Sequence, residues 1–321
     1  MKSLWRGKRR FNLGGFGLLL IALSSPSLHA RAATYYLIVS GLGGEADYEQ
    51  RFTSAARDIA RIAKASNTDV QSYELTGQDA TAARMKDALS IISRSATPQD
   101  DFILILIGHG SFDGTIYKFN LPGPDVSAEE IADMCSGIRA GRQLIVDTSS
   151  ASGAAVSPLR HPGRAIIAAT KSGTEKSATV FVRYWIEALQ DPSADTDKSG
   201  SISALEAFMY ATGKTNDFYK KQNLLATEHA VFTDVSHSEP VRDVSTGQGA
   251  LLASLTLVRL DSVRPSASNP ANVELLRKKE ELEQKIDALK FQKAGMDSTE
   301  YKKQLTTLLL QLARVQQELD R

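Results

Sequence analysis

The sequence predicts an α/β protein built on a mostly parallel, doubly wound sheet. Three observations lead to this prediction: short runs of apolar residues recur along the chain, segments with helical spacing separate them, and the runs show little alternation of apolar with polar residues. Uninterrupted apolar runs are expected for strands whose two faces are both covered by helices. Strands that alternate with helices at this spacing indicate a parallel sheet.

The first predicted strand, residues 34–41, is followed by a glycine-rich turn and then by a helix over residues 46–66. The turn, GLGGEA, also matches a relaxed dinucleotide-binding pattern. No acidic residue follows at the offset which that pattern requires, so we interpret the glycines as a tight turn. A second strand, residues 69–75, precedes a helix over about residues 80–93.

The most apolar predicted strand, residues 102–107, ends in Gly108, His109 and Gly110. The remaining predicted elements are a helix at 127–138, strands at 144–147 and 164–173, and a last strand closing the sheet at 249–260. Cys135, the only cysteine, shares the apolar face of the predicted helix, which indicates core packing and not a nucleophile.

Reactive side chains follow two of these strands. The strand at 144–147 ends in TSSASG, residues 148–153, and the strand at 102–107 ends beside His109. Carboxyl ends of neighbouring parallel strands meet at one edge of a sheet, where ligands bind, so these residues form a candidate site. Gly110 has a backbone N–H that can face an oxyanion. The alternative is that the hydroxyl groups cap the next helix.

IGHGS after one strand and TSSASG after the next resemble the caspase and legumain group of cysteine peptidases, with the caspase-hemoglobinase fold. GHGSFDG, YKFNLPGPD, ASG, LEAF and LATEHA are similar to a bacterial branch of that group with hydroxyl residues in place of the cysteine. The resemblance covers about residues 33–219. It implies His109 as general base, Gly110 as oxyanion-hole amide and Ser150 at the nucleophile's position, and it places Glu175 near a pocket-lining glutamate. A solvated loop charge is the alternative for Glu175.

The absence of the cysteine opens three hypotheses about function. A serine hydroxyl needs an aligned base to act as a nucleophile, whereas a thiol is far more reactive. The leading hypothesis is a catalytically impaired pseudopeptidase that acts as a calcium-stabilised binding or scaffold module for a peptide or protein partner. The second is a serine-dependent hydrolase that uses Ser150 and His109. The third is an envelope assembly factor that works through its C-terminal helices.

Residues 195–206, DTDKSGSISALE, fit the EF-hand calcium loop. The predicted ligands at positions 1, 3, 5, 7, 9 and 12 are Asp195, Asp197, Ser199, Ser201, Ser203 and Glu206, and Gly200 occupies the sharp bend. With only three carboxylates, the loop is expected to bind Ca²⁺ weakly, with a Kd of roughly 10⁻⁴ to 10⁻³ M. The alternative is an acidic turn in which Ser203 and Glu206 form a helix-capping box.

A second group of possible metal ligands lies further along the chain. His229 and His237 have Glu228, Asp234 and Glu239 nearby. Their spacing matches no known metal motif, so we interpret the segment as a polar surface loop.

The two ends of the chain have separate roles in this interpretation. Residues 1–32 have a basic start, a short apolar run and small residues near Ala30 and Ala32, the pattern of a signal peptide, so we expect an exported, periplasmic protein with no permanent membrane span. Of the 38 Lys and Arg residues, six lie in this segment, which leaves 32 against 37 acidic residues, a net charge of −5 that argues against nucleic acid as a partner.

After the α/β domain, residues 33–261, the sequence predicts a linker at 262–272 and a helical hairpin or coiled coil at 273–321. In the second helix Tyr301, Leu305, Leu308, Leu312, Val315 and Leu319 form a heptad seam, and Leu275, Leu282, Ile286 and Leu289 form a stripe on the first. These helices can pack on each other, on the core, or on another copy or partner.

Overall fold

A computed structural model describes residue 1, residues 32–44, 46–66, 69–234, 239–244, 248–260 and 295–319, and single positions between 274 and 292. The linker predicted at 262–272 and His237 lie outside the described residues. So does the signal peptide predicted at 1–32, except for its first and last residues. The α/β domain has two hydrophobic core clusters, and every residue of both lies at or after Ala33.

The predicted α/β class with a mostly parallel sheet is confirmed. The central sheet has the strand order β10-β8-β7-β3-β1-β2, and all neighbours are parallel except β10, which is antiparallel to β8. The strands are β1 (Thr34–Ser40), β2 (Val70–Leu75), β3 (Asp101–Ile107), β7 (Arg142–Asp147), β8 (Arg164–Ala168) and β10 (Val231–Thr233). The four apolar runs predicted as buried strands form the interior of this sheet.

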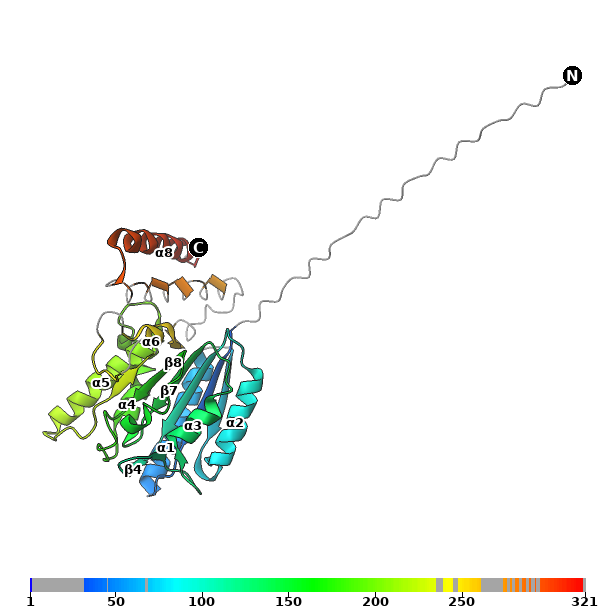
Figure 1. The fold of residues 1–321 in the computed structure, drawn as a ribbon. Coiled ribbons are helices and arrows are strands. Elements are labelled where there is room, and N and C mark those ends of the chain that lie inside the picture. The colour runs from blue at the N-terminus through cyan, green and yellow to red at the C-terminus, as the bar shows by residue number, and fades with distance from the viewer. Residues whose placement is uncertain are drawn as a thin grey trace. The chain divides into compact units, whose positions relative to one another are not determined.

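Helices cover both faces of the sheet, as the apolar strands required (Figure 1). Alternate residues of β3 point to opposite faces: Ile103 and Ile105 belong to one core cluster, and Leu104 and Leu106 to the other. The first cluster includes residues of α1 (Ala46–Ser66), α4 (Phe181–Ala188) and α5 (Ala204–Lys221), and the second includes residues of α2 (Ala82–Ser95) and α3 (Ala128–Cys135). Cys135 is buried in the second cluster, where burial raises the pKa of its thiol to about 11.

Short elements connect the larger ones. A three-stranded antiparallel sheet follows β3 and contains β4 (Gly110–Phe112), β5 (Tyr117–Phe119) and β6 (Val126–Ser127). Three 3₁₀ turns are η1 (Gly77–Asp79), η2 (Ser152–Ala155) and η3 (Pro192–Ala194). The turn after β1 is closely packed: a side chain at Gly41 would lie 2.5 Å from the Asn120 carbonyl oxygen, and one at Gly43 would lie 2.4 Å from the Glu49 amide nitrogen. Close packing of this kind explains the glycines as a tight turn.

The prediction of a last sheet strand at 249–260 is wrong. The segment forms α6 (Ala250–Ser254) and then β11 (Thr256–Arg259), which pairs with β9 (Ser201–Ser203) in a separate two-stranded sheet. The strand that closes the central sheet is β10, in the stretch whose composition favours a polar surface loop. The run at 250–254 has the composition of a helix, and Arg142 fixes its end by donating to the Ser254 carbonyl while pairing with Asp101.

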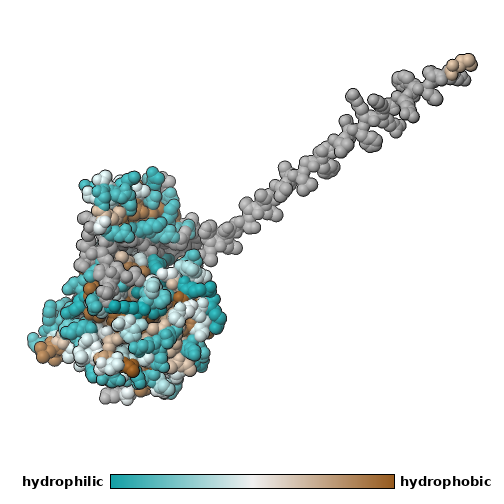
Figure 2. Space-filling view, in the orientation of Figure 1, coloured by the Kyte–Doolittle hydropathy of each residue, from teal (hydrophilic) through white to brown (hydrophobic). Residues whose placement is uncertain are grey.

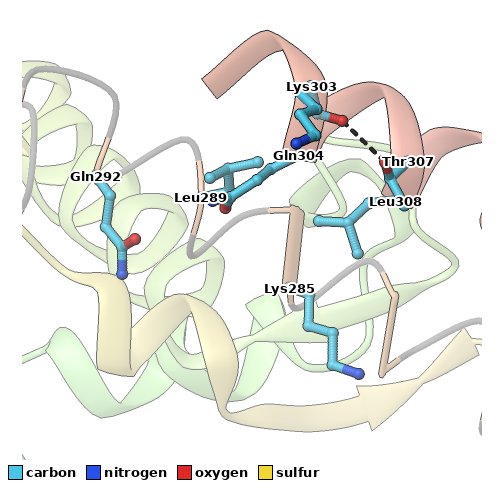
Figure 3. Close-up of a pocket in the computed structure, with 7 residues that line it drawn as sticks. All are labelled: Lys285, Leu289, Gln292, Lys303, Gln304, Thr307 and Leu308. Atoms are coloured by element: carbon cyan, nitrogen blue, oxygen red, sulfur yellow. Dashed lines mark hydrogen bonds between the residues drawn. The ribbon is translucent and has the colours of Figure 1, made fainter. Parts of the chain in front are cut away.

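The described residues of the C-terminal segment are mostly helical, and the hairpin or coiled coil expected at 273–321 stays a prediction. Its second helix is α8 (Ser298–Leu319), and the described residues between 274 and 292 are helical. Leu282, Ile286, Leu289 and Val315 are buried, and Tyr301, Leu305, Leu308 and Leu312 are half-buried, so the predicted stripes are the covered faces. A cavity of about 450 Å³ lies between α8 and the described positions 285–292 (Figure 3). It is lined by Lys285, Leu289, Gln292, Lys303, Gln304, Thr307 and Leu308. Association of this hairpin with a partner stays a prediction.

No helix in the described portion of the chain combines the length and the apolar character needed to cross a membrane.

Candidate functional site

The carboxyl edge of the sheet brings the two motifs together. Strands β3 and β7 are neighbours in parallel register, with Leu106 opposite Asp147, so the chain leaves both strands on the same side of the sheet. His109 and Gly110 follow β3, and Ser150 follows β7. The sequence predicted this shared edge but not which atoms make contact across it.

The hydroxyl group of Ser150 bonds to the backbone of Gly110. Its Oγ donates to the Gly110 carbonyl oxygen at 3.0 Å and accepts from the Gly110 N–H at 3.1 Å. The Ser150 side chain is almost fully buried. A Cβ on Gly110 would lie 2.3 Å from the Ser150 carbonyl oxygen, so only glycine fits there. The amide that would serve as an oxyanion-hole donor is therefore bonded to the candidate nucleophile itself.

The imidazole of His109 contacts aromatic rings. Its ring packs edge-on against Tyr48 and Phe52 of α1, with ring centroids 4.8 Å and 5.1 Å apart. Among the residues described here, the structure gives the His109 ring no hydrogen bond, whether to Ser150 or to any other side chain. The sequence showed that Phe52 belongs to the apolar face of α1, but it gave no sign that this face receives His109. The structure thus places His109 and Ser150 at one edge without joining them.

A buried acid lies directly beneath the turn. Asp147 accepts hydrogen bonds from the hydroxyl groups of Tyr117 and Ser149, both at 2.7 Å, and from the Ser149 N–H at 3.0 Å. The Tyr117 and Ser149 hydroxyl oxygens also lie 2.7 Å apart. Burial raises the pKa of Asp147 despite these bonds, and burial together with the nearby Asp147 carboxylate raises the pKa of Tyr117. Sequence reasoning treated Asp147 only as a strand end and missed Tyr117 altogether.

The turn that carries Ser150 is also fastened to the loop after β8. Ala151 has a left-handed backbone with φ of 58°, and its N–H donates to the Glu175 carbonyl at 2.8 Å. The Gly153 N–H donates to Thr170 Oγ1 at 2.9 Å. A left-handed alanine costs about 1–2 kcal/mol, so the surrounding contacts hold the turn in this shape. Hydrogen bonds on both sides of Ser150 therefore hold this turn in one conformation.

The carboxylate of Glu175 joins two loops. It accepts from the Lys171 N–H at 2.9 Å and from the His229 N–H at 3.1 Å, and its Oε1 lies 2.5 Å from His229 Nδ1. Its side chain is only 10% exposed, and that of His229 is 23% exposed. A freely solvated loop charge would not show these contacts. His229 is the partner that sequence reasoning did not assign to Glu175.

The neighbouring Glu228 has a different task. Its buried carboxylate accepts from the backbone N–H groups of Val180 and Phe181, at 2.7 Å and 3.2 Å, at the start of α4. The Tyr219 hydroxyl also donates to it, at 3.0 Å. Burial raises the pKa of Glu228. Interpreting the Glu228–His229 stretch as a polar surface loop was wrong, because both side chains are used to bind neighbouring loops and the chain enters β10 directly afterwards.

The predicted calcium loop brings its carboxylates together. Asp195, Asp197 and Glu206 each place an oxygen within 4.8 Å of the others. Asp195 accepts from the N–H groups of Ser199 and Gly200, at 2.9 Å and 3.0 Å, and the bend uses a Gly200 φ of +82°. Burial raises the pKa of the Asp195 carboxyl. A cation beside these oxygens would offset the mutual repulsion of three carboxylates and the burial of Asp195, so the residues present fit Ca²⁺.

The serines of this loop have local partners. Ser199 Oγ lies 3.0 Å from Ser201 Oγ and 3.3 Å from the Ser201 carbonyl oxygen. Ser203 and Glu206 form a capping box at the start of α5, so this part of the alternative interpretation is present alongside the acidic cluster. The other oxygen of Glu206 accepts from the Thr196 N–H at 2.9 Å. Strand β9 covers loop positions 7 to 9 and pairs with β11, which fixes the loop to the domain.

The chain was compared with family models, with curated protein sequences and with solved structures. No family model matches the chain, and no curated protein sequence matches it. Among the chains of known structure that match is the Drosophila initiator caspase Dronc, at 10% sequence identity and a TM-score of 0.43, with 65% of this chain and 82% of that chain covered.

Proposed function

We propose that this chain is an exported, non-catalytic binding module of caspase-like or legumain-like design, stabilised by a weakly bound calcium ion. One observation carries the proposal: the Gly110 backbone takes both hydrogen-bonding roles of the Ser150 hydroxyl. The His109 ring packs against Tyr48 and Phe52 instead of contacting that hydroxyl. A serine hydroxyl without an aligned base is a poor nucleophile. The binding partner would be a peptide or protein.

Exposed apolar side chains near the carboxyl edge support a partner of that kind. Ile116, in the turn between β4 and β5, is exposed, and so is Leu42, whose N–H donates to the Asn120 carbonyl at 2.9 Å. Leu42 follows the end of β1, and Ile116 lies in the hairpin that begins at Gly110. A rim of this composition favours an extended peptide with apolar side chains over a small charged ligand.

An activity-based probe tests the absence of catalysis. We expect a fluorophosphonate probe to leave Ser150 unlabelled, at the level of a Ser150→Ala variant, while an active serine hydrolase in the same assay is labelled. The reason is that no described base contacts the Ser150 hydroxyl. Intact-mass and peptide-mapping spectrometry measure the label. Labelling of Ser150 that disappears in a His109→Ala variant would establish the serine-hydrolase alternative and overturn the proposal.

Calcium titration tests the second part of the proposal. With a Kd in the region of 10⁻⁴ to 10⁻³ M, calcium at ten times its Kd is expected to raise the free energy of unfolding by about 1.4 kcal/mol. Asp195→Asn and Glu206→Gln should abolish this increase. Asp217→Asn, which removes an exposed carboxylate of α5 outside the loop, should preserve it.

Thermal unfolding and isothermal titration measure both effects. If the wild type shows neither heat nor a shift of Tm at millimolar calcium, the loop is an acidic turn that ends in a capping box.

A further inference from the structure

The loop that leaves α5 exposes two adjacent leucines. Leu224 is 56% exposed and Leu225 is 90% exposed, and each residue from 220 to 227 is exposed. Figure 2 shows hydrophobic surface gathered at the end of α5, which Figure 1 places at the lower left. We call residues 222–226 the α5 tip. Leaving two leucines in water forgoes a hydrophobic gain, so this pair is a candidate binding surface.

The α5 tip has a fixed shape. The Asn223 N–H donates to the Lys220 carbonyl at 3.1 Å and the Leu224 N–H donates to the Tyr219 carbonyl at 3.0 Å. With Asn223 at a φ of 53°, this is the Schellman closure of a helix, which fixes the backbone that carries the leucines.

The far side of the tip is fixed as well. The Tyr219 hydroxyl lies 3.0 Å from Thr227 Oγ1 and donates to the buried Glu228 carboxylate. Both ends of the tip are therefore anchored to the core, and the leucines project from a rigid base. Docking such a base costs little conformational entropy.

Positive charge flanks the leucines. Lys220 and Lys221 occupy the last turn of α5, and both are exposed. The structure assigns neither lysine an ion pair with any residue that it describes. Lysine stems can lie along an apolar surface while their ammonium groups reach a polar boundary. Two leucines next to two lysines match the chemistry of a bilayer interface, where acyl chains lie beneath anionic headgroups.

From this arrangement we propose that the α5 tip inserts its leucines into an anionic lipid surface. Lys220 and Lys221 bind the headgroups, and Leu224 and Leu225 enter the acyl region. A stable protein interface buries about 800 Å² on each partner. The tip offers two apolar side chains on a projecting turn, which is small for a protein interface but sufficient for entry into a lipid surface.

Vesicle binding tests the proposal with the chain that begins at Ala32, which retains both clusters of the core. The protein should sediment with vesicles of phosphatidylcholine mixed with phosphatidylglycerol. A Leu224→Ser/Leu225→Ser double variant should bind at least about tenfold more weakly. Lys220→Gln/Lys221→Gln should lose about tenfold on mixed vesicles and little on pure phosphatidylcholine. Added salt should weaken the wild type more than the lysine variant.

A second pair of exposed leucines provides the matched control. Leu309 and Leu310 of α8 are 48% and 58% exposed, so Leu309→Ser/Leu310→Ser removes another pair of adjacent exposed leucines. This variant should bind vesicles like the wild type. All variants should keep the wild-type Tm, because the replaced side chains are exposed, and Leu225→Ser alone serves if the double variant unfolds.

A fluorophore reports where the tip goes. Ala226→Cys introduces an exposed thiol, whereas Cys135 is buried and its raised pKa keeps it unreactive. An environment-sensitive dye at position 226 should shift to the blue with mixed vesicles. The proposal is overturned if the wild type does not bind them, if the tip variant binds as well as the control, or if a crosslinker at position 226 captures a protein in place of lipid.

Discussion

Gly110→Ala is expected to lower the free energy of unfolding by about 3 kcal/mol, at the upper end of what overpacking costs. The added methyl group would lie 2.3 Å from the Ser150 carbonyl oxygen and 2.7 Å from Ser149 Oγ. Both atoms belong to the turn that carries Ser150. This turn cannot move away from residue 110 without breaking the hydrogen bonds between Ser150 and Gly110. Urea unfolding of the variant measures the loss.

Gly213→Ala is the matched control for that substitution. Apart from the adjacent residues and the backbone of its own helix, no described residue has an atom within 4 Å of the position that its methyl group would take, and Gly213 lies inside α5. Alanine there should stabilise the protein by about 0.5–1 kcal/mol, because glycine is a poor helix former. If both variants unfold at the same urea concentration as the wild type, the close approach of Gly110 to the Ser150 turn is wrong.

Tyr117→Phe is expected to cost about 1–3 kcal/mol of stability. The substitution removes the hydroxyl group that donates to Asp147 at 2.7 Å and leaves a fully buried carboxyl oxygen without that donor. Tyr36→Phe is the control, since Tyr36 is also buried and no hydrogen bond joins its hydroxyl to a described residue. The control should change stability by a few tenths of a kcal/mol.

The same network predicts a pH dependence with a definite sign. Burial raises the pKa of Asp147 in the folded protein above its unfolded value of 3.8, so the folded state binds the proton more tightly. Stability therefore falls as the pH rises from 3.8 through the folded-state pKa, by at most about 1.4 kcal/mol per pH unit for one group. Asp195 and Glu228 are raised by burial too and add to the slope.

Asp147→Asn isolates the contribution of this one acid. The difference between the wild-type and variant stability curves should change across that window and become constant at higher pH. Chemical unfolding at a series of pH values measures it. A difference that does not vary with pH would show that Asp147 titrates alike in the folded and unfolded chains.

The sequence by itself determined the four interior strands of the sheet and the edge at which the candidate site lies. The apolar runs that became β1, β3, β7 and β8 could be found because a strand covered on both faces shows no polar alternation. The same rule located His109 and the hydroxyl turn at one edge. The acidic cluster of the predicted calcium loop could be anticipated because EF-hand ligand positions follow the chain at fixed intervals, so that local spacing alone brings Asp195, Asp197 and Glu206 together.

Only the tertiary structure decided what the side chains do. The bonds between Ser150 and Gly110 span 40 residues, and those between Tyr117 and Asp147 span 30. The strand that closes the sheet was also predicted in the wrong place. The true strand, β10, is only three residues long, and the longer apolar run at 249–260 begins with residues that form the helix α6. Local pattern records periodicity and composition, whereas the partner of a hydroxyl, a carboxylate or an edge strand is set by which distant segment the packed core brings beside it.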